Sequence, residues 1–129
     1  MLQPTRLIDT AIIIDYLRGS DIARTWLDQF SPGELIVSVV TAAELLAGCR
    51  DRKEQNLIEK ELNFYPLVWV SCDASQTAWK WYRKYHLSHG VGFLDCLIGA
   101  SAHSYGVIMS TLNEKHFQPF PDLKLERPY

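Results

Sequence analysis

Short apolar runs alternate with longer amphipathic stretches along the chain, and this alternation is what most restricts its fold. Strand-like runs occupy residues 5–9, 34–38, 66–70, 107–110 and, more weakly, 123–126. Helix-like stretches separate the first four of them. Because parallel strands need long crossovers that cover both faces of the sheet, the sequence predicts an α/β fold. We expect a three-layer sandwich, with a mainly parallel central sheet of five strands flanked by helices.

Capping residues predict where several helices begin and end. Thr10 can cap a helix that stops at Gly19, and Ser20 can open a second helix that ends before the turn at 31–33. Residues 41–44, Thr-Ala-Ala-Glu, match a capping box in which Glu44 reaches back to the amide of the Thr41 cap. Further helices are predicted over 51–63, 73–86 and 93–105.

Length and composition predict a single globular domain, residues 1–129. The formal net charge of −2 excludes a protein that coats nucleic acid through bulk positive charge. No apolar run is long enough to span a bilayer and no signal-peptide pattern is present, so we expect a cytoplasmic protein. Cys49, Cys72 and Cys96 lack zinc or disulfide spacing and are expected to be small buried hydrophobes.

Four polar residues, Asp9, Glu44, Asp95 and Asn113, each follow a strand-like run or open a helix-like one. Ligands of open α/β sheets collect at the carboxyl ends of the strands, so we expect these side chains to converge there. Each also has a simple structural explanation. Asp9 can cap a helix, Glu44 can complete the capping box, Asp95 can favour a helix N-terminus, and Asn113 can form a turn.

Asp95 is the strongest candidate of the four, because its helix is apolar or small on nearly every side and is therefore expected to be buried. Gly99 lies one turn later on the same face, where glycine costs ~1 kcal/mol relative to alanine. We expect Gly99 to leave room beside Asp95 for a strand, a cation or a substrate. Glu44 also lies in an otherwise apolar helix, where a carboxylate is costly unless paired or bound to metal.

Three carboxylates brought together repel one another unless a divalent cation neutralises them. Oxygen ligands suit Mg²⁺ or Mn²⁺, and such an ion lowers the pKa of a bound water that can attack a phosphodiester. The pattern therefore indicates metal-assisted phosphodiester hydrolysis. His103 and His116 lack the spacing of a zinc site and are not expected to be ligands.

Residues 79–86 combine four aromatic side chains with four basic ones. RNA bases stack on aromatic rings while Lys and Arg hold the phosphates, so this stretch can bind RNA. An amphipathic helix that places its aromatics in the core or in a dimer contact explains the pattern equally well. The sequence leaves both explanations open.

At these residues the chain resembles the PIN-domain ribonucleases, and within them the VapC-like toxins of type II toxin–antitoxin pairs. The resemblance covers nearly the whole length and is carried by four segments in order: 7–10 with 15–19, 38–48, 95–100 and 111–117. It implies a PIN-like fold and a Mg²⁺- or Mn²⁺-dependent endoribonuclease. It also implies a homodimer held inactive by a cognate, VapB-like antitoxin.

The resemblance also implies roles for individual residues. Asp9, Glu44 and Asp95 correspond to the family's metal-binding acids, and Thr10 corresponds to its accessory hydroxyl. Asn113 falls where many relatives have a fourth acid, and the adjacent Glu114 can substitute for it. Ala11 is a second, minor departure, since relatives often carry a polar side chain there.

Two other functions fit parts of the pattern. A catalytically inactive PIN domain that binds RNA or protein is supported by Asn113 in place of an acid. A receiver-like phosphoacceptor would also use a strand-end Asp with Mg²⁺, but the chain lacks a second acid beside Asp9. For the antitoxin, hydrophobicity and the resemblance together predict a docking surface on the early helices, at Ile12, Ile13, Tyr16 and Leu17.

Overall fold

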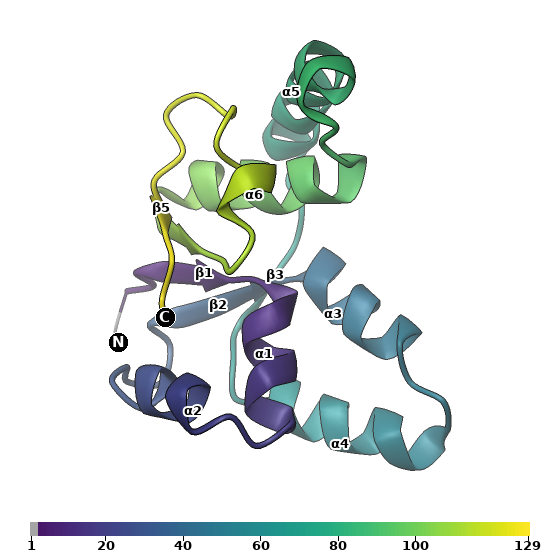
Figure 1. The fold of residues 1–129 in the computed structure, drawn as a ribbon, viewed down its shortest axis with the longest axis vertical. Coiled ribbons are helices and arrows are strands. Elements are labelled where there is room, and N and C mark those ends of the chain that lie inside the picture. Colours follow the sequence, from purple (N-terminus) through teal and green to yellow (C-terminus); the bar gives the residue numbers. More distant parts are fainter. Residues whose placement is uncertain (1–2) are drawn as a thin grey trace.

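The computed structural model describes residues 3–129, and its centre is a five-stranded sheet between two layers of helices (Figure 1). The strands lie in the order β3-β2-β1-β4-β5, and every neighbouring pair is parallel. This confirms the predicted α/β fold, although each strand is shorter than its apolar run. The strands are β1 (Arg6–Ile8), β2 (Leu35–Ser38), β3 (Leu67–Val68), β4 (Ile108–Ser110) and β5 (Leu125–Glu126).

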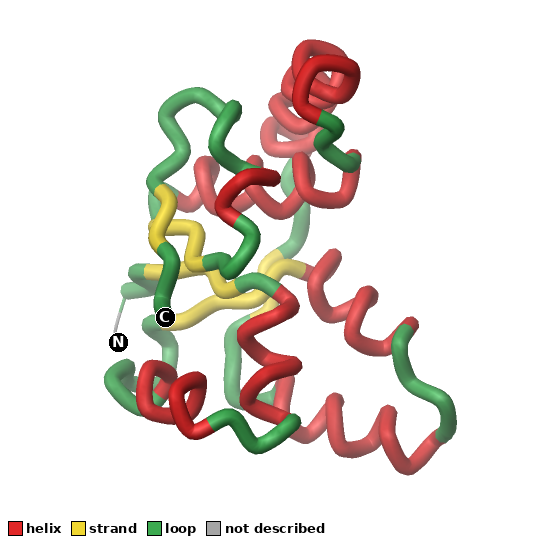
Figure 2. Tube along the Cα trace, in the orientation of Figure 1, coloured by secondary structure: helices red, strands yellow, loops and turns green. Residues whose placement is uncertain are grey.

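Six α-helices and one short 3-10 helix connect the strands (Figure 2). Helices α5 and α6 lie on one face of the sheet, α1, α2 and α4 lie on the other, and α3 extends from β2 at the side (Figure 1). No helix within residues 3–129 is long and apolar enough to cross a membrane. The helices are α1 (Thr10–Leu17), α2 (Asp21–Leu27), α3 (Val39–Ala47), α4 (Arg52–Leu62), α5 (Cys72–His89), α6 (Phe93–Tyr105) and η1 (Glu114–His116).

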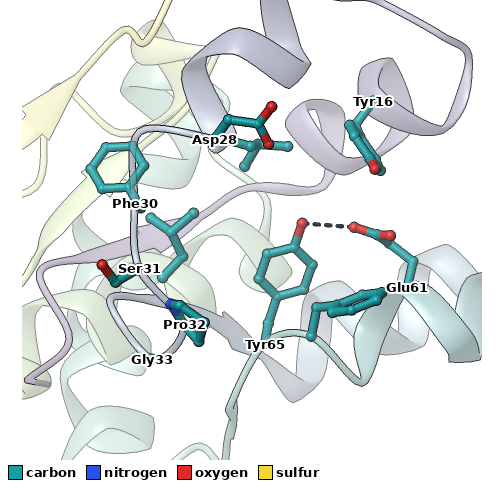
Figure 3. Close-up of a pocket in the computed structure, with 11 residues that line it drawn as sticks. Tyr16, Asp28, Phe30, Ser31, Pro32, Gly33, Glu61 and Tyr65 are labelled. Carbon is teal, nitrogen blue, oxygen red and sulfur yellow. Dashed lines mark hydrogen bonds between the residues drawn. The ribbon is translucent and has the colours of Figure 1, made fainter. Parts of the chain in front are cut away.

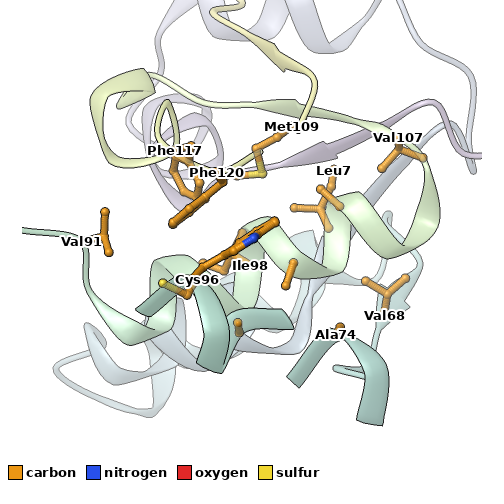
Figure 4. Close-up of a cluster of buried hydrophobic side chains, with 14 of the residues drawn as sticks. Leu7, Val68, Ala74, Val91, Cys96, Ile98, Val107, Met109, Phe117 and Phe120 are labelled. Atoms are coloured by element: carbon orange, nitrogen blue, oxygen red, sulfur yellow. The ribbon is translucent and has the colours of Figure 1, made fainter. Parts of the chain in front are cut away.

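The alternating side chains of the strands divide the interior into two cores. Leu7 and Ile36 point into the core under α5 and α6, which Figure 4 shows, whereas Ile8 and Val37 point into the core under α1 to α4. Successive residues of a strand face opposite sides of a sheet, so both faces need apolar residues when both are covered. This explains why the strand runs are continuously apolar.

Two helices begin at different residues than the capping patterns predicted. The cap of α1 is Asp9, whose carboxylate accepts from the Thr10 amide, and Thr10 is the first helical residue. The cap of α3 is Ser38, so the helix begins at Val39, two residues before Thr41. The prediction of a capping box was therefore wrong. Ser38 is the last residue of β2 and has an extended backbone, so it occupies the N-cap position of α3, and Thr41 lies inside the helix.

Gly99 has a different role from the one predicted. A Cβ atom there would lie 3.2 Å from Phe120, 3.3 Å from Phe117 and 3.4 Å from Leu123, which is tighter than ordinary side-chain contact. The missing side chain therefore lets the segment after β4 pack against α6. The space serves this long-range packing rather than a cation or a substrate beside Asp95.

The cysteines agree with the prediction at one position only. Cys96 is fully buried in the core under α5 and α6, and its burial raises the pKa of the thiol to about 11. Cys49 is half-buried, and Cys72, the first residue of α5 after the Ser71 cap, is exposed. The expectation that all three are buried was wrong for Cys72.

Candidate active site

Asp9 lies where the central strand β1 ends, and its carboxylate links two neighbouring elements. One oxygen, Oδ1, accepts from the Thr10 amide at 2.8 Å and so caps α1. The other, Oδ2, accepts from the Thr111 hydroxyl at 2.8 Å, just after β4. The residue is only 8% exposed. Asp9 is thus a helix cap, as its structural explanation predicted, and also a buried carboxylate at the carboxyl edge of the sheet.

Glu44 faces the same edge from the middle of α3. Its Oε1 accepts a hydrogen bond from the Thr10 hydroxyl at 3.2 Å, so this Glu contacts α1 rather than the start of its own helix. Partial desolvation raises the pKa of Glu44, and the negative charges of Asp9 and Asp95 raise it further, against the lowering effect of the Thr10 hydrogen bond.

Asp95 lies in the first turn of α6, as predicted, and its side chain is 28% exposed. Burial raises the pKa of Asp95, His116 opposes that shift, and the charge of Asp9 adds to it. His116 Nδ1 is 3.2 Å from Asp95 Oδ2. Local sequence pattern does not predict this contact, because only the turn of η1 after β4 brings His116 back over α6.

The three carboxylates therefore come from three separate segments and lie close enough to repel one another. As oriented, no three Asp, Glu, His or Cys side chains of residues 3–129 could hold one metal ion. Each acid is turned toward its own partner: Asp9 toward Thr111, Glu44 toward Thr10, and Asp95 toward His116. The donor set itself, carboxylate oxygens of concentrated negative charge, fits a hard cation such as Mg²⁺ or Mn²⁺. The three side chains would have to rotate away from their present partners to bind one cation together.

Asn113 joins this region through its backbone. Its amide donates to the Thr111 hydroxyl at 3.0 Å, and this is the same hydroxyl that donates to Asp9. The residue is exposed at the cap position of η1 and makes no side-chain cap there. Glu114 follows as the half-buried first residue of η1. Asn113, the predicted fourth residue of the site, thus lies beside the acids. Its connection to them runs through its backbone amide and not through its side chain.

Comparison with known proteins agrees with this geometry. The family model of the PIN domain matches residues 6–120. The chain belongs to the PIN-domain family. It is 36% identical over 124 residues to "Ribonuclease VapC19" of Mycobacterium tuberculosis, covering 92% of this chain and 97% of that protein. It is 35% identical over 121 residues to "Ribonuclease VapC10" of the same organism, covering 92% of this chain and 90% of that protein.

Solved structures of low sequence identity share the PIN fold. The DNA-bound VapBC complex from Salmonella typhimurium matches with a TM-score of 0.84 and 19% identity, over 98% of this chain and 100% of that one. A toxin–antitoxin complex from Klebsiella pneumoniae matches with a TM-score of 0.80 and 22% identity, over 97% of this chain and 98% of that one. At these identities the matches establish the fold alone.

Several hollows lie on the side of the PIN domain formed by α1 to α4, and two of them are lined in part by residues of α4. The larger, about 650 Å³, runs between α1, α3 and α4, and its lining includes Leu17, Ile58 and the acid Glu44. The smaller, about 260 Å³, is shown in Figure 3. There the Tyr65 hydroxyl donates to Glu61 Oε2 at 2.8 Å, and burial raises the pKa of Glu61. Only the larger hollow reaches the acids.

Thr111 and Thr41 provide a matched pair of substitutions, because both are fully buried. The Thr111 hydroxyl bonds Asp9 and the Asn113 amide, whereas the Thr41 hydroxyl has no partner in the described residues. Thr111→Val should therefore lower the free energy of unfolding by about 1–3 kcal/mol, because it leaves a buried carboxylate oxygen unpaired. Thr41→Val should be neutral or stabilising.

Urea denaturation of both variants measures this difference. Equal losses of unfolding free energy in the two variants would contradict the claim that Thr111 holds the Asp9 carboxylate in place.

Proposed function

We propose that this PIN-domain protein is a metal-dependent endoribonuclease toxin that acts in the cytoplasm and is neutralised by a cognate antitoxin. The convergence of Asp9, Glu44 and Asp95 at the carboxyl edge of the sheet carries the proposal. It is supported by family membership and by the ribonuclease names of the two relatives. The raised pKa values of Glu44 and Asp95 add to it: burial raises both most and the charge of Asp9 raises them further, and a divalent cation would stabilise the ionised carboxylates against both effects.

In this proposal the three acids hold Mg²⁺ or Mn²⁺, and Asn113 or Glu114 completes the site. When bound, the ion supplies a water of lowered pKa and neutralises charge on the phosphate. The hydroxyl of Thr10 orients Glu44, and the hydroxyl of Thr111 fixes Asp9, so the chain itself positions the ligands. Such outer hydrogen bonds commonly set the orientation of metal ligands.

A PIN domain that binds RNA without cleaving it is the alternative. It is favoured by Asn113, which replaces an acid and contacts the cluster only through its backbone amide. A cleavage assay separates the two functions. Both predict that the chain binds RNA, but only the ribonuclease predicts that new RNA ends are formed.

The antitoxin is proposed to occupy the hollow between α1, α3 and α4. Ile12 and Ile13 are fully buried in the core, so the expectation that they form a docking surface was wrong: their side chains face the sheet. Leu17 is 41% exposed and lines the hollow together with Leu57 and Ile58. Because Glu44 also lines it, a segment bound there would reach the acids.

Asp95→Asn tests the ribonuclease directly. With Mg²⁺ or Mn²⁺, the purified wild-type chain should cut total cellular RNA into discrete fragments, and a chelator should prevent it. Asp95→Asn should cut at least about a hundredfold more slowly. Its melting temperature should not fall much, because the change also removes a repelling charge.

Asp28→Asn, at an exposed acid after α2, is the control and should keep full activity. Undiminished cleavage by Asp95→Asn would rule out the proposed site. Well-folded wild-type protein that binds RNA but never cleaves it would establish the binding-module alternative.

Leu17→Glu tests the antitoxin surface. The hollow is lined by both apolar and charged side chains, and a carboxylate in place of Leu17 would remove one of its exposed apolar contacts, so the substitution should reduce co-purification of the co-expressed antitoxin by about tenfold or more. Leu87→Glu is the control, because Leu87 is exposed on α5 at the opposite face of the sheet. If both variants retained the antitoxin as well as the wild type, the partner would bind elsewhere.

A further inference from the structure

Residues 126–129 leave the edge strand β5 and reach the helical layer on the other face of the sheet (Figure 1). Leu125, just before them, packs against the core under α5 and α6, whereas Tyr129 packs against the core under α1 to α4. Pro128 fixes its own backbone angle φ and disfavours a helical backbone at Arg127, so the segment is a stiff, extended connection. We call residues 126–129 the strap.

The strap makes a hydrogen bond with each of three consecutive residues at the end of β4. The Ser110 hydroxyl donates to Glu126 Oε1 at 2.8 Å, and the Thr111 amide donates to the Glu126 carbonyl oxygen at 3.1 Å. Arg127 Nη1 donates to the Leu112 carbonyl oxygen at 2.8 Å. Because β5 pairs with β4 over two residues only, these bonds extend the hold beyond the strand ladder. The strap thus holds Thr111 and both of its neighbours.

Glu126, at the start of the strap, is itself held in one orientation. Arg6 Nε donates to Glu126 Oε1 at 2.5 Å, and Arg6 Nη2 donates to Oε2 at 3.4 Å. Burial opposes ionisation of Glu126, but the hydrogen bonds from Arg6 and Ser110 outweigh it and lower the pKa of this carboxyl. The start of the strap is therefore fixed to β1 as well as to β4.

Tyr129, at the other end of the strap, is fixed to α1. Its hydroxyl donates to Asp15 Oδ2 at 2.9 Å. Burial raises the pKa of Tyr129, and the bond to Asp15 raises it further, so the hydroxyl keeps the proton that it donates. Asp15 lies on α1, the helix that Asp9 caps. The strap therefore ties α1 to the segment that contains Thr111.

These two elements supply the two hydrogen-bond donors of Asp9. Oδ1 accepts from the Thr10 amide at the start of α1, and Oδ2 accepts from the Thr111 hydroxyl. A hydrogen bond tolerates only a narrow range of distance and angle, so a shift of α1 relative to the end of β4 would break one of the two bonds. The strap opposes that shift, although its bonds reach Asp9 only through other residues.

We propose that Arg127 and Tyr129 are positioning residues, which hold the Asp9 carboxylate in one orientation by tying α1 to the segment after β4. Groups that orient a metal ligand from outside strongly affect metal affinity and activity, and sites tolerate little misplacement of their ligands. The inference rests on the proposed ribonuclease function, in which Asp9 is a metal ligand. The hold on Asp9 can nevertheless be measured without metal.

Amide hydrogen exchange of the full chain in chelator tests this hold. The Thr10 amide donates to Asp9, and the Asn113 amide donates to the hydroxyl that holds Asp9, so both report on the site. The Val37 amide, within the buried strand β2, reports on the whole fold. Tyr129→Phe removes one hydroxyl and keeps the ring. It should speed exchange of the two site amides about threefold to tenfold relative to Val37.

Tyr65→Phe is the matched control. Tyr65 is partly buried against the same core as Tyr129, and its hydroxyl likewise donates to an acid, Glu61, at 2.8 Å. This bond links α4 to the residues that follow it and does not involve α1 or the end of β4. The control should therefore leave exchange of the two site amides unchanged.

Arg127→Ala tests the other end of the strap and should speed exchange of the Asn113 amide to a similar extent. Arg127→Lys keeps a donor and should restore most of the protection, whereas Arg24→Ala removes an arginine paired only within α2 and should have no effect. With metal and RNA, Arg127→Ala should lower kcat about threefold to tenfold and leave KM nearly unchanged. In a Thr111→Val background it should have little further effect, because the bond that it supports is already absent.

Equal acceleration at Val37 and at the two site amides would show that the strap only stabilises the fold, and would overturn the proposal. Unchanged exchange in Tyr129→Phe and Arg127→Ala would do the same, as would an equal effect of Tyr65→Phe. Failure of the ribonuclease function looks different: the wild type would then show no cleavage in metal, while exchange of the site amides in chelator still depended on the strap.

Discussion

The mutual repulsion of three carboxylates, tempered by hydrogen bonds to their neighbours, is the constraint on which this edge of the molecule depends. Asp9 illustrates it most clearly, because one oxygen caps α1 and the other is held by Thr111 after β4. Burial raises the pKa values of Glu44 and Asp95, and the charge of Asp9 raises both further. The fold thus fixes one acid firmly and brings the other two within range of its charge, which is the arrangement a divalent cation would stabilise.

The two sides of the sheet serve this site differently. On the α1 to α4 side, a hollow lined by Leu17 and Ile58 reaches Glu44, which suits a protein segment that blocks the acids. On the α5 and α6 side, the first turn of α6 places Asp95 at the same edge, within range of the charge of Asp9. The alternating strand residues allow this division, since each face is filled by its own core.

Local patterns in the sequence predicted the parts of this structure that depend on nearby residues. The continuous apolar strands and their alternation with helices predicted the parallel sheet, and residues at element ends predicted Asp9 and Asp95 at one edge. Contacts between residues far apart in the sequence could not be predicted from these local patterns. Ser38 and Thr41 are both good caps, and only the end of β2 decides between them. Likewise, the contact of His116 with Asp95 depends on how the chain folds back over α6.

Calorimetric titration of the purified chain with Mg²⁺ and with Mn²⁺ tests the central claim most directly. We predict binding that releases protons and weakens as the pH falls toward the raised pKa values of Glu44 and Asp95, because the ion needs the ionised acids. Glu44→Gln should weaken binding about tenfold or more. Glu61→Gln, at a buried carboxyl away from the site, should not. Absence of metal binding, or equal effects of the two substitutions, would contradict the account.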